Sequence, residues 1–433
     1  MRLLYNILFP LFFLFSAPFY FWKLHRRGNW RQGFGQRFGR HDDTLKQALT
    51  GQRVLWLHAV SVGEALLCAR LVEVLRNEFK DWALVVSTTT TTGMGELEKQ
   101  LPPEIHRIYF PIDLAPCVAA TFNTIQPDAI ILVEAEIWPN FLWRARRNNI
   151  PVILANARLS DRSQQGYRRF GFLFRELFAA LAAVGAQNEN DARRLSEIGC
   201  HSDVIEITGS MKFDGAAASK ESTVDVPKLL RKLCTKDNPP VLVGGSTHEG
   251  EERLLAEMFP RLKKICPGLL LVLVPRHFER ARAVGEQLQM LGQAYCLRSE
   301  LNKPTEADCL VVDSTGELMS FYETATVVFV GKSITARGGQ NPIEPAALGR
   351  PMVFGPHMQN FRAVAHDFLD ASAAVQIQNA SELEPAIADL LKNSEKRTAL
   401  GENAQAVVAA NQGATGRTAD MAARVLKSLD EPA

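Results

Sequence analysis

Apolar runs alternate with amphipathic stretches along most of the chain, at the lengths typical of strands and helices. The runs contain Val, Ile and Leu with little polar alternation, as in parallel strands that are buried on both faces. Strand followed by helix, repeated in two series, predicts two successive doubly wound α/β halves. The predicted strands are 54–58, 82–88, 128–136, 151–157, 182–187 and 204–209, then 240–246, 269–275, 309–313, 326–331 and 351–355.

The order and spacing of these elements also predict where the domains begin and end. A stretch short of strand signals and rich in polar residues, 215–238, separates the two series and is interpreted as a linker with room for one helix. We therefore expect an N-terminal Rossmann-like domain over 41–214 and a C-terminal one over 239–412. Residues 1–40 form a separate hydrophobic and basic segment, and 413–433 a final helix for which packing on the N-terminal domain is one option.

The N-terminal segment carries a membrane signal. Residues 3–22 contain no charged side chain, and as a helix they would be about 30 Å long, the thickness of a bilayer's hydrocarbon core. Aromatic residues at 19–22 and the basic residues Lys23, Arg26 and Arg27 follow, which places the rest of the chain in the cytoplasm. A cleaved signal peptide lacks support because no small-residue cleavage site precedes the basic segment. Pro10 and Pro18 keep open a helix that lies in the interface, so the anchor is single-pass or monotopic.

Composition excludes several classes of site. The first 40 residues hold seven of the 49 Lys and Arg residues and none of the 47 Asp and Glu residues, so the remaining body is mildly acidic and no nucleic-acid partner is expected. Seven cysteines are scattered without a CxxC pair, and nine histidines without HxxxH or HExxH. We therefore expect neither a disulfide framework nor a metal site.

The first candidate for chemistry is the turn after the strand 54–58, where HAVSVGE leads into a helix. Ligands of open α/β sheets bind at the carboxyl ends of strands, and Glu64 lies there. One interpretation is structural, since Ser61 and Glu64 have the spacing of a capping box. The other is functional: Glu64 abstracts a proton from a hydroxyl that approaches the sheet edge.

A second strand end repeats this placement in LVEAEIWPN, residues 132–140. Glu134 and Glu136 are two residues apart and would point to the same side of an extended chain. One of them can be structural and pair with an arginine such as Arg158.

In the second half, two strand ends suggest anion binding. GSTHEGEE (245–252) fails both the dinucleotide and the Walker patterns, yet its backbone N–H groups and hydroxyls, Ser246 among them, suit an anion. VPRHFER (274–280) places Pro275 and Arg276 at the next strand end, where an arginine can grip a phosphate or a base.

The most specific signal is DSTGEL (313–318) followed by GGQNPIEPAALGRP (338–351). Asp313 to Thr315 can cap a helix whose free N–H groups at Gly316 and Glu317 would bind a phosphate. Gly338 and Gly339 allow close backbone approach. Asn341 and Pro342 start a short helix with Glu344 on its first turn, where, with no cation expected nearby, it could bind the two hydroxyls of a ribose.

These motifs together resemble one family. GGQNPIEPAALGRP is similar to the nucleotide-sugar signature of GT-B glycosyltransferases, and with HAVSVGE, VEAEIWPN, NARLS, GSMKFD, PRH and DSTGEL the chain resembles the 3-deoxy-D-manno-octulosonic acid (Kdo) transferases along nearly its whole length. The resemblance implies a GT-B fold, with two Rossmann-like domains facing across a cleft. It also implies inverting, metal-independent transfer of Kdo from CMP-Kdo to the tetra-acylated disaccharide lipid A precursor, at the cytoplasmic face of the inner membrane.

The resemblance also assigns roles to residues. It implies that Glu64 is the general base in a single displacement. We expect Glu134, Glu136 and Arg158 to be acceptor-side or supporting residues. Two positions depart from the usual motifs, Ser210 in GSMKFD and Ala135 in VEAEI. Contacts to the CMP-Kdo donor are implied, or suggested by the loops above, for Lys212, Ser246, Pro275, Arg276, Gly316, Glu317, Leu318, Gly339, Asn341 and Glu344.

Two other functions compete with this one. The nearer is a GT-B enzyme that uses a UDP-sugar and a polyprenyl-lipid acceptor. The other is a membrane-tethered nucleotide-binding protein or adaptor without turnover, against which a carboxylate at Glu64 argues. The number of Kdo residues added and the oligomeric state do not follow from the sequence.

Overall fold

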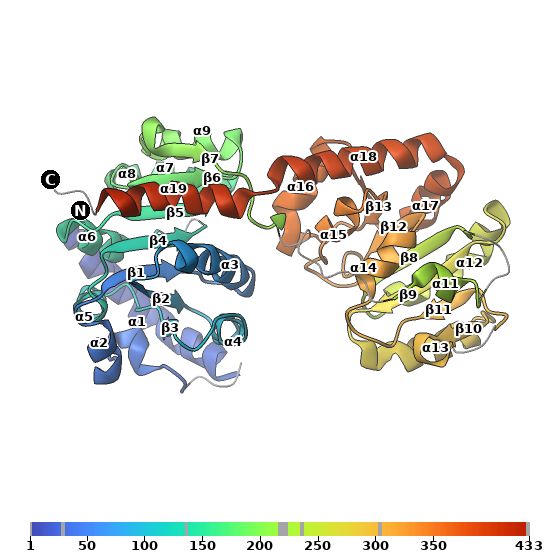
Figure 1. The fold of residues 1–433 in the computed structure, drawn as a ribbon, viewed down its shortest axis with the longest axis horizontal. Coiled ribbons are helices and arrows are strands. Elements are labelled where there is room, and N and C mark those ends of the chain that lie inside the picture. The colour runs from blue at the N-terminus through green and yellow to red at the C-terminus, as the bar shows by residue number, and fades with distance from the viewer. Residues whose placement is uncertain are drawn as a thin grey trace. The chain divides into compact units, whose positions relative to one another are not determined.

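The computed structural model describes residues 2–26, 31–134, 137–214, 224–233, 238–301 and 305–429. Two compact units divide the chain, one comprising Met1–Asp214 with Gln412–Ala433 and the other Gly215–Asn411 (Figure 1). Each unit contains a seven-stranded parallel sheet with helices on both faces. The predicted fold class, two Rossmann-like halves, is confirmed.

Unit 1 is built on a sheet in the order β3-β2-β1-β4-β5-β6-β7, with every neighbouring pair parallel. The chain adds strands outward on one side of β1 and then, from β4 onward, on the other side, so the strand order reverses between β1 and β4. Such a reversal is typical of the doubly wound topology. The strands are β1 Arg53–His58, β2 Trp82–Thr88, β3 His106–Tyr109, β4 Ala129–Val133, β5 Val152–Ala157, β6 Ala183–Ala186 and β7 Ile205–Ile207.

The helices of unit 1 cover both faces of this sheet. Alternate residues of β1 show why the middle of the strand is apolar throughout: Leu55 and Leu57 pack on the face of α3 and α19, and Val54 and Trp56 on the opposite face. The helices are α1 Arg2–Arg26, α2 Asp43–Leu49, α3 Val62–Glu78, α4 Thr91–Gln100, α5 Ala115–Ile125, α6 Pro139–Arg147, α7 Asp161–Arg169, α8 Gly171–Phe178, α9 Glu189–Ile198 and α19 Ala414–Ser428.

Unit 2 repeats the plan in the order β10-β11-β9-β8-β12-β13-β14, again parallel throughout. Its strands are β8 Val241–Thr247, β9 Leu270–Pro275, β10 Tyr295–Leu297, β11 Cys309–Val311, β12 Val327–Val330, β13 Met352–Phe354 and β14 Val375–Gln376. Its helices are α11 Val226–Leu230, α12 Glu251–Ile265, α13 Ala281–Met290, α14 Leu318–Thr324, α15 Ile343–Ala347, α16 Arg362–Asp370, α17 Leu383–Lys392 and α18 Ser394–Asn411.

Three strands, β3, β10 and β14, have no counterpart among the predicted ones. All three are short and lie at or next to a sheet edge. Because such strands are only half-covered, they lack the long apolar runs that identify central strands; both residues of β14, for example, are partly exposed.

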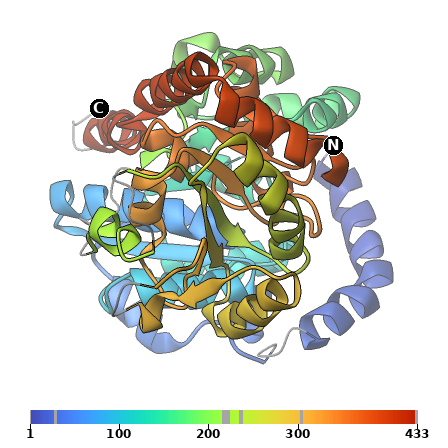
Figure 2. The same cartoon turned by 90° about the vertical axis from the view of Figure 1, so that its right-hand side faces the viewer.

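One helix within the described residues, α1, is long and apolar enough to cross a membrane by its length and composition. Figure 2 shows it as the long blue helix at the side of the molecule. It belongs to unit 1, and the Tyr5 hydroxyl donates to the Asp113 carboxylate (2.8 Å).

Candidate active site

The strand ends of unit 1 bring the first group of candidate residues to the place where the sheet order reverses. β1 and β4 are parallel neighbours, so the turn that follows His58 and the one that follows Val133 leave the same edge side by side. Ligands of doubly wound sheets bind at such a reversal. Glu64 and Glu134 come from these two turns.

Glu64 forms a capping box at the start of α3. Its backbone N–H donates to the Ser61 hydroxyl (3.3 Å), while its carboxylate accepts from that hydroxyl (2.7 Å) and from the N–H of Val60 (2.8 Å). Each carboxylate oxygen therefore accepts one hydrogen bond and retains a lone pair. The capping interpretation of Ser61 and Glu64 is confirmed, and it leaves the carboxylate able to accept a proton.

The environment of Glu64 raises its pKa above the usual value. Burial is the largest cause, since the side chain is only 9% exposed, and the negative charge of Glu134 is the second. The hydrogen bonds from Ser61 and Val60 act in the opposite direction. A carboxylate with a raised pKa is a stronger base once ionised, which suits general base catalysis near neutral pH.

Glu134 differs from the expectation in its backbone and in its partner. β4 ends at Val133, and Glu134 has φ 62°, a left-handed conformation. The expectation that Glu134 and Glu136 face the same side rests on an extended chain, and this premise is wrong at Glu134. Glu136 lies outside the described residues. The cation beside Glu134 is Lys212, with Nζ 2.9 Å from its carboxylate, where Arg158 was suggested.

Lys212 is held in place by the strand that neighbours β4. The side-chain oxygen of Asn156, in β5, accepts from the backbone N–H of Met211 (3.0 Å), and Asn156 itself has φ 53°. Farther along the same motif, the Asp214 carboxylate accepts from the N–H groups of Gly413 and Thr415 (2.7 and 2.6 Å), so that it caps α19. GSMKFD thus joins the Glu134 turn to the C-terminal helix.

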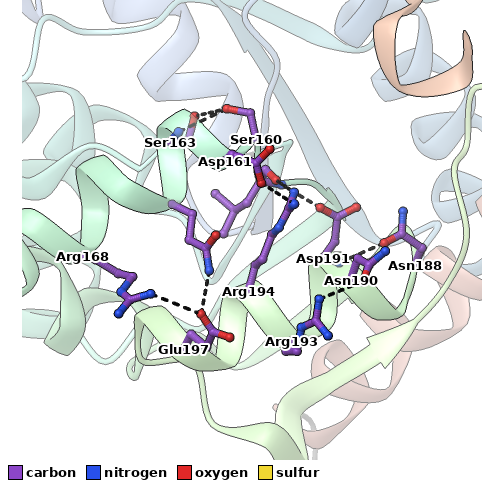
Figure 3. Close-up of polar contacts among 12 residues, drawn as sticks. Ser160, Asp161, Ser163, Arg168, Asn188, Asn190, Asp191, Arg193, Arg194 and Glu197 are labelled. Atoms are coloured by element: carbon purple, nitrogen blue, oxygen red, sulfur yellow. Dashed lines mark hydrogen bonds and ion pairs between the residues drawn. The ribbon is translucent and has the colours of Figure 1, made fainter. Parts of the chain in front are cut away.

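Arg158 lies in the loop between β5 and α7. Residues of α9 make polar contacts with this loop and with the start of α7 (Figure 3). The N–H of the next residue, Leu159, donates to the Asp191 carboxylate (3.0 Å), and Arg194 donates to the Leu159 carbonyl (2.7 Å) and pairs with Asp161. Burial raises the pKa of Asp191, while this N–H and the charges of Arg158 and Arg194 lower it. Asp191 is thus a charge partner of Arg158.

His58, the last residue of β1, was missed as a candidate. Its ring is fully buried and stacks on Phe110 at 3.8 Å between centroids, and Nδ1 lies 3.0 Å from the Ser87 hydroxyl. Burial lowers the pKa of His58 to about 3, so the ring is neutral at pH 7. Its Nε2 has no hydrogen-bond partner among the described residues. The sequence pattern did not indicate a functional role for it, because a histidine next to an apolar run is usually a residue of the hydrophobic core.

In unit 2, the corresponding reversal lies between β8 and β12, and Glu251 connects the two strand ends. Its fully buried carboxylate accepts four backbone N–H groups: that of His248 (2.9 Å) after β8 and, after β12, those of Lys332, Ser333 and Ile334 (2.7, 2.9 and 3.0 Å). The backbone N–H groups in and near GSTHEGEE, the motif expected to bind an anion, therefore include ones that already donate to a carboxylate of the chain itself, that of Glu251. Ser246 remains partly exposed beside them, with φ 51°.

Glu344 and Arg276 come together at the same edge. Arg276 follows β9, and its N–H donates to the carbonyl of Thr247 at the end of β8 (3.0 Å). Glu344, on the first turn of α15, accepts from the side-chain amide of Asn341 (3.1 Å). Burial raises the pKa of Glu344, while Asn341 and the charge of Arg276 lower it. The expectation that no cation lies near Glu344 is wrong: Arg276 is close enough to act on it.

The loop after β11 is organised differently from the expected cap. The Asp313 carboxylate accepts from the N–H of Ser299 (2.9 Å) and from its hydroxyl, so it does not cap α14, whose first residue is Leu318. Gly316 has φ 86°, and Glu317 forms an ion pair with Arg298 (2.9 Å). Arg298 was missed because it lies in a segment without a motif.

Further polar residues gather at this edge beyond those expected. Gln340 lies 3.3 Å from Nε2 of His248, and the rings of His248 and His277 are 6.0 Å apart. Burial lowers the pKa of His248, and the charge of Lys332 is the next cause. The N–H of Gly339, with φ 74°, donates to the Lys332 carbonyl (2.9 Å). Pro275 is buried at the end of β9. Cationic groups and backbone amides of this kind suit a phosphate.

A metal-binding cluster is not found in the part of the chain that the structure describes: no three His, Cys, Asp or Glu side chains there could share an ion. The six cysteines within it are all free, and Cys234 lies outside it.

Comparison with known proteins gives concordant results. The family model of 3-deoxy-D-manno-octulosonic-acid transferases matches residues 32–215. The chain is 33% identical over 411 residues to 3-deoxy-D-manno-octulosonic acid transferase of Bordetella pertussis, covering 92% of this chain and 94% of the relative. It is 30% identical over 399 residues to the enzyme of that name from Haemophilus influenzae, covering 90% and 91%.

Solved structures support the fold. UDP-GlcNAc 2-epimerase from Neisseria meningitidis, bound to UDP-GlcNAc, aligns with 86% of this chain and 100% of its own, with a TM-score of 0.55 and 14% identity. At that identity the likeness shows the two-Rossmann architecture alone.

Proposed function

Because the chain belongs to the family of 3-deoxy-D-manno-octulosonic acid (Kdo) transferases, and is thus a glycosyltransferase, we propose that it transfers Kdo from CMP-Kdo to the tetra-acylated disaccharide lipid A precursor. The reaction inverts the anomeric carbon in one displacement, with Glu64 as general base. The observation that carries the proposal is the buried Glu64 carboxylate, with its raised pKa, at the point between β1 and β4 where the strand order of unit 1 reverses.

In the proposed step, the Glu64 carboxylate takes the proton of the acceptor's hydroxyl as that oxygen attacks the ketosidic carbon of Kdo. The new carbon–oxygen bond forms while the bond from that carbon to the phosphate oxygen breaks. CMP leaves with the electron pair of the broken bond, and the proton stays on Glu64. One base on the acceptor side is sufficient for such a displacement.

Unit 2 is proposed to bind the donor. Arg276 and Lys332 would face the phosphate of CMP, whose negative charge grows as the bond breaks, so that no metal is required. Glu344, oriented by Asn341, would accept hydrogen bonds from the ribose hydroxyls. In unit 1, Lys212 is proposed to neutralise the donor's carboxylate, and its ion pair with Glu134 orients it.

The acceptor is proposed to reach unit 1 from the inner leaflet of the inner membrane, on the cytoplasmic side. A lipid with two phosphates and four acyl chains does not leave the bilayer, so the enzyme must work at its surface. The apolar α1 and the basic residues that follow it in the sequence support this location.

The decisive experiment is incubation of the purified protein with CMP-Kdo and the tetra-acylated precursor, with mass spectrometry of the lipid. We expect mass gains of one or more Kdo units with the wild-type protein and none with Glu64→Gln. Glu73→Gln, an exposed acid on α3, serves as the matched control and should retain activity. Full activity of Glu64→Gln would remove Glu64 from the role of base.

Donor competition tests the alternative of a UDP-sugar and a polyprenyl acceptor. CMP should inhibit transfer, and UDP at the same concentration should not. Inhibition by UDP alone, with transfer to a polyprenyl phosphate, would replace the present proposal.

A further inference from the structure

α1 contacts unit 1 along one side rather than at one end. Within 2–19, its half-buried residues recur at helical spacing, while the positions between them are exposed, Phe15 for example to 83%. Five of the half-buried residues are Tyr5, Asn6, Phe9, Phe13 and Ser16. From Tyr5 to Ser16 the helix rises about 16 Å, more than half the thickness of the hydrocarbon core.

Polar contacts fix the N-terminal end of this side. The Tyr5 hydroxyl donates to the Asp113 carboxylate (2.8 Å), and the Asn140 side-chain amide donates to the side-chain oxygen of Asn6 (2.9 Å). Asp113 is buried and also accepts the N–H groups of Asn140 and Phe141, both at 2.9 Å, at the start of α6. A buried carboxylate that keeps all its donors is costly to expose, so these contacts hold the helix against the unit.

These contacts are incompatible with a helix that spans the bilayer. A spanning helix is surrounded by hydrocarbon over its length, and a Rossmann unit with charged loops cannot enter that region. The two ends of a spanning helix also lie on opposite sides of the membrane. The N-terminal end of α1, however, is hydrogen-bonded through Tyr5 to Asp113, in the same unit as the chain that follows the C-terminal end of the helix. The exposed apolar side of α1 instead suits the interface of the membrane.

Between α1 and the unit lies a cavity of about 340 Å³, a volume within the range of ligand pockets. Its walls are mostly apolar, with Phe9 and Phe13 of α1 and Phe110 and Trp138 among the lining residues, while Arg37 and Asp113 also line it. Val60 also lines it, and the N–H of Val60 donates to the Glu64 carboxylate (2.8 Å). The cavity thus runs from the membrane-facing helix to the turn that carries the candidate base.

We propose that α1 lies in the plane of the cytoplasmic membrane surface and that the cavity beneath it takes one acyl chain of the lipid acceptor. The acceptor chemistry rests on the proposed function. An apolar chain is the occupant that fits, because the walls are mostly apolar, the cavity adjoins the apolar helix α1, and it reaches Val60, which donates a hydrogen bond to Glu64. Seating one chain there would position the acceptor's hydroxyl relative to the base.

The position of the N-terminus tests the helix orientation. In spheroplasts, an epitope tag placed before Met1 should resist protease added outside and be digested only after lysis. Digestion in intact spheroplasts would show a spanning helix and overturn the inference, whatever the enzyme transfers.

A filled cavity tests the acyl-chain site. Ser16→Phe adds a ring to the cavity wall, and Leu14→Phe adds the same ring at a position 67% exposed on α1. Because the ring displaces about two methylenes of the chain from the cavity, Ser16→Phe should raise KM for the tetra-acylated precursor roughly tenfold with kcat unchanged. Leu14→Phe should stay within about twofold. Equal KM values in the two variants would refute the site.

A second measurement does not depend on turnover or on tolerance of the larger side chain. A photoreactive phenylalanine analogue is introduced at Phe13 or at Phe15, and the protein is irradiated with radiolabelled precursor in vesicles of neutral phospholipid. We expect a precursor adduct at Phe13 that unlabelled precursor competes away, and no such competition at Phe15. If the wild-type protein transfers Kdo but position 13 gives no competed adduct, the cavity inference fails while the proposed function stands.

Discussion

The connection that Glu251 makes between two strand ends of unit 2 gives the sharpest stability prediction. Its carboxylate is buried and accepts four backbone N–H groups, two on each oxygen. Glu251→Gln preserves the shape of the side chain but replaces one oxygen by an NH₂ group, which cannot accept. Two charge-assisted hydrogen bonds are lost, at roughly 1.5–3 kcal/mol each, so the free energy of unfolding of unit 2 should fall by about 3–6 kcal/mol.

The distribution of tryptophan allows the two units to be followed separately. All six tryptophans lie within residues 22–143, in unit 1, and unit 2 has none. In urea titrations of the full chain in detergent, the tryptophan fluorescence of Glu251→Gln should change at the same urea concentration as that of the wild type. The far-UV circular dichroism should show a second transition that moves to lower urea.

Glu249→Gln is the matched control, because the same change is made two residues away at an exposed position. It should alter stability by less than about 0.5 kcal/mol. A loss below about 1 kcal/mol for Glu251→Gln would mean that water or neighbouring groups replace the lost acceptor, and the reasoning from buried amides would be refuted.

Three further predictions concern unit 1. Glu134→Gln removes the negative charge that raises the pKa of Glu64; because the base must be ionised, the acid limb of the kcat/KM profile should move to lower pH. Phe141→Ala empties a fully buried site among three aromatic rings and should cost about 3–5 kcal/mol, measured by the tryptophan transition in urea. Asp214→Ala removes the acceptor for two N–H groups at the start of α19 and should cost about 1–2 kcal/mol in the same titration, and Asp214→Asn less.

Each of these has a matched control. Glu73→Gln should leave the pH profile unmoved, and an identical shift in both variants would exclude a local effect of charge on Glu64. Phe172→Ala, at a position 58% exposed, should cost little; a similar loss at both phenylalanines would contradict the burial argument. If Asp214→Ala unfolds at the wild-type urea concentration, the cap contributes nothing.

The central strands and the candidate base could be predicted from the sequence because their signals are local. A strand buried on both faces is apolar at most positions, so β1, β2, β5, β8 and β9 each appear as a mainly apolar run in the sequence. The Ser61–Glu64 spacing specifies a capping box within four residues. The family resemblance likewise depends on short motifs, each of which is complete in the sequence.

The tertiary structure alone decided which charged groups meet. Lys212 reaches Glu134 from 78 positions away because β5 holds the Met211 backbone beside the end of β4, and no local pattern encodes that approach. Glu251 had the local signature of an acid in a helix's first turn, yet its partners at 332–334 come from a different strand end. Side-chain pairing across a parallel sheet depends on strand order, and strand order depends on how the whole chain packs. The same holds for α1: its composition predicts contact with a membrane, but its orientation follows from where Tyr5 and Asn6 find their hydrogen-bond partners.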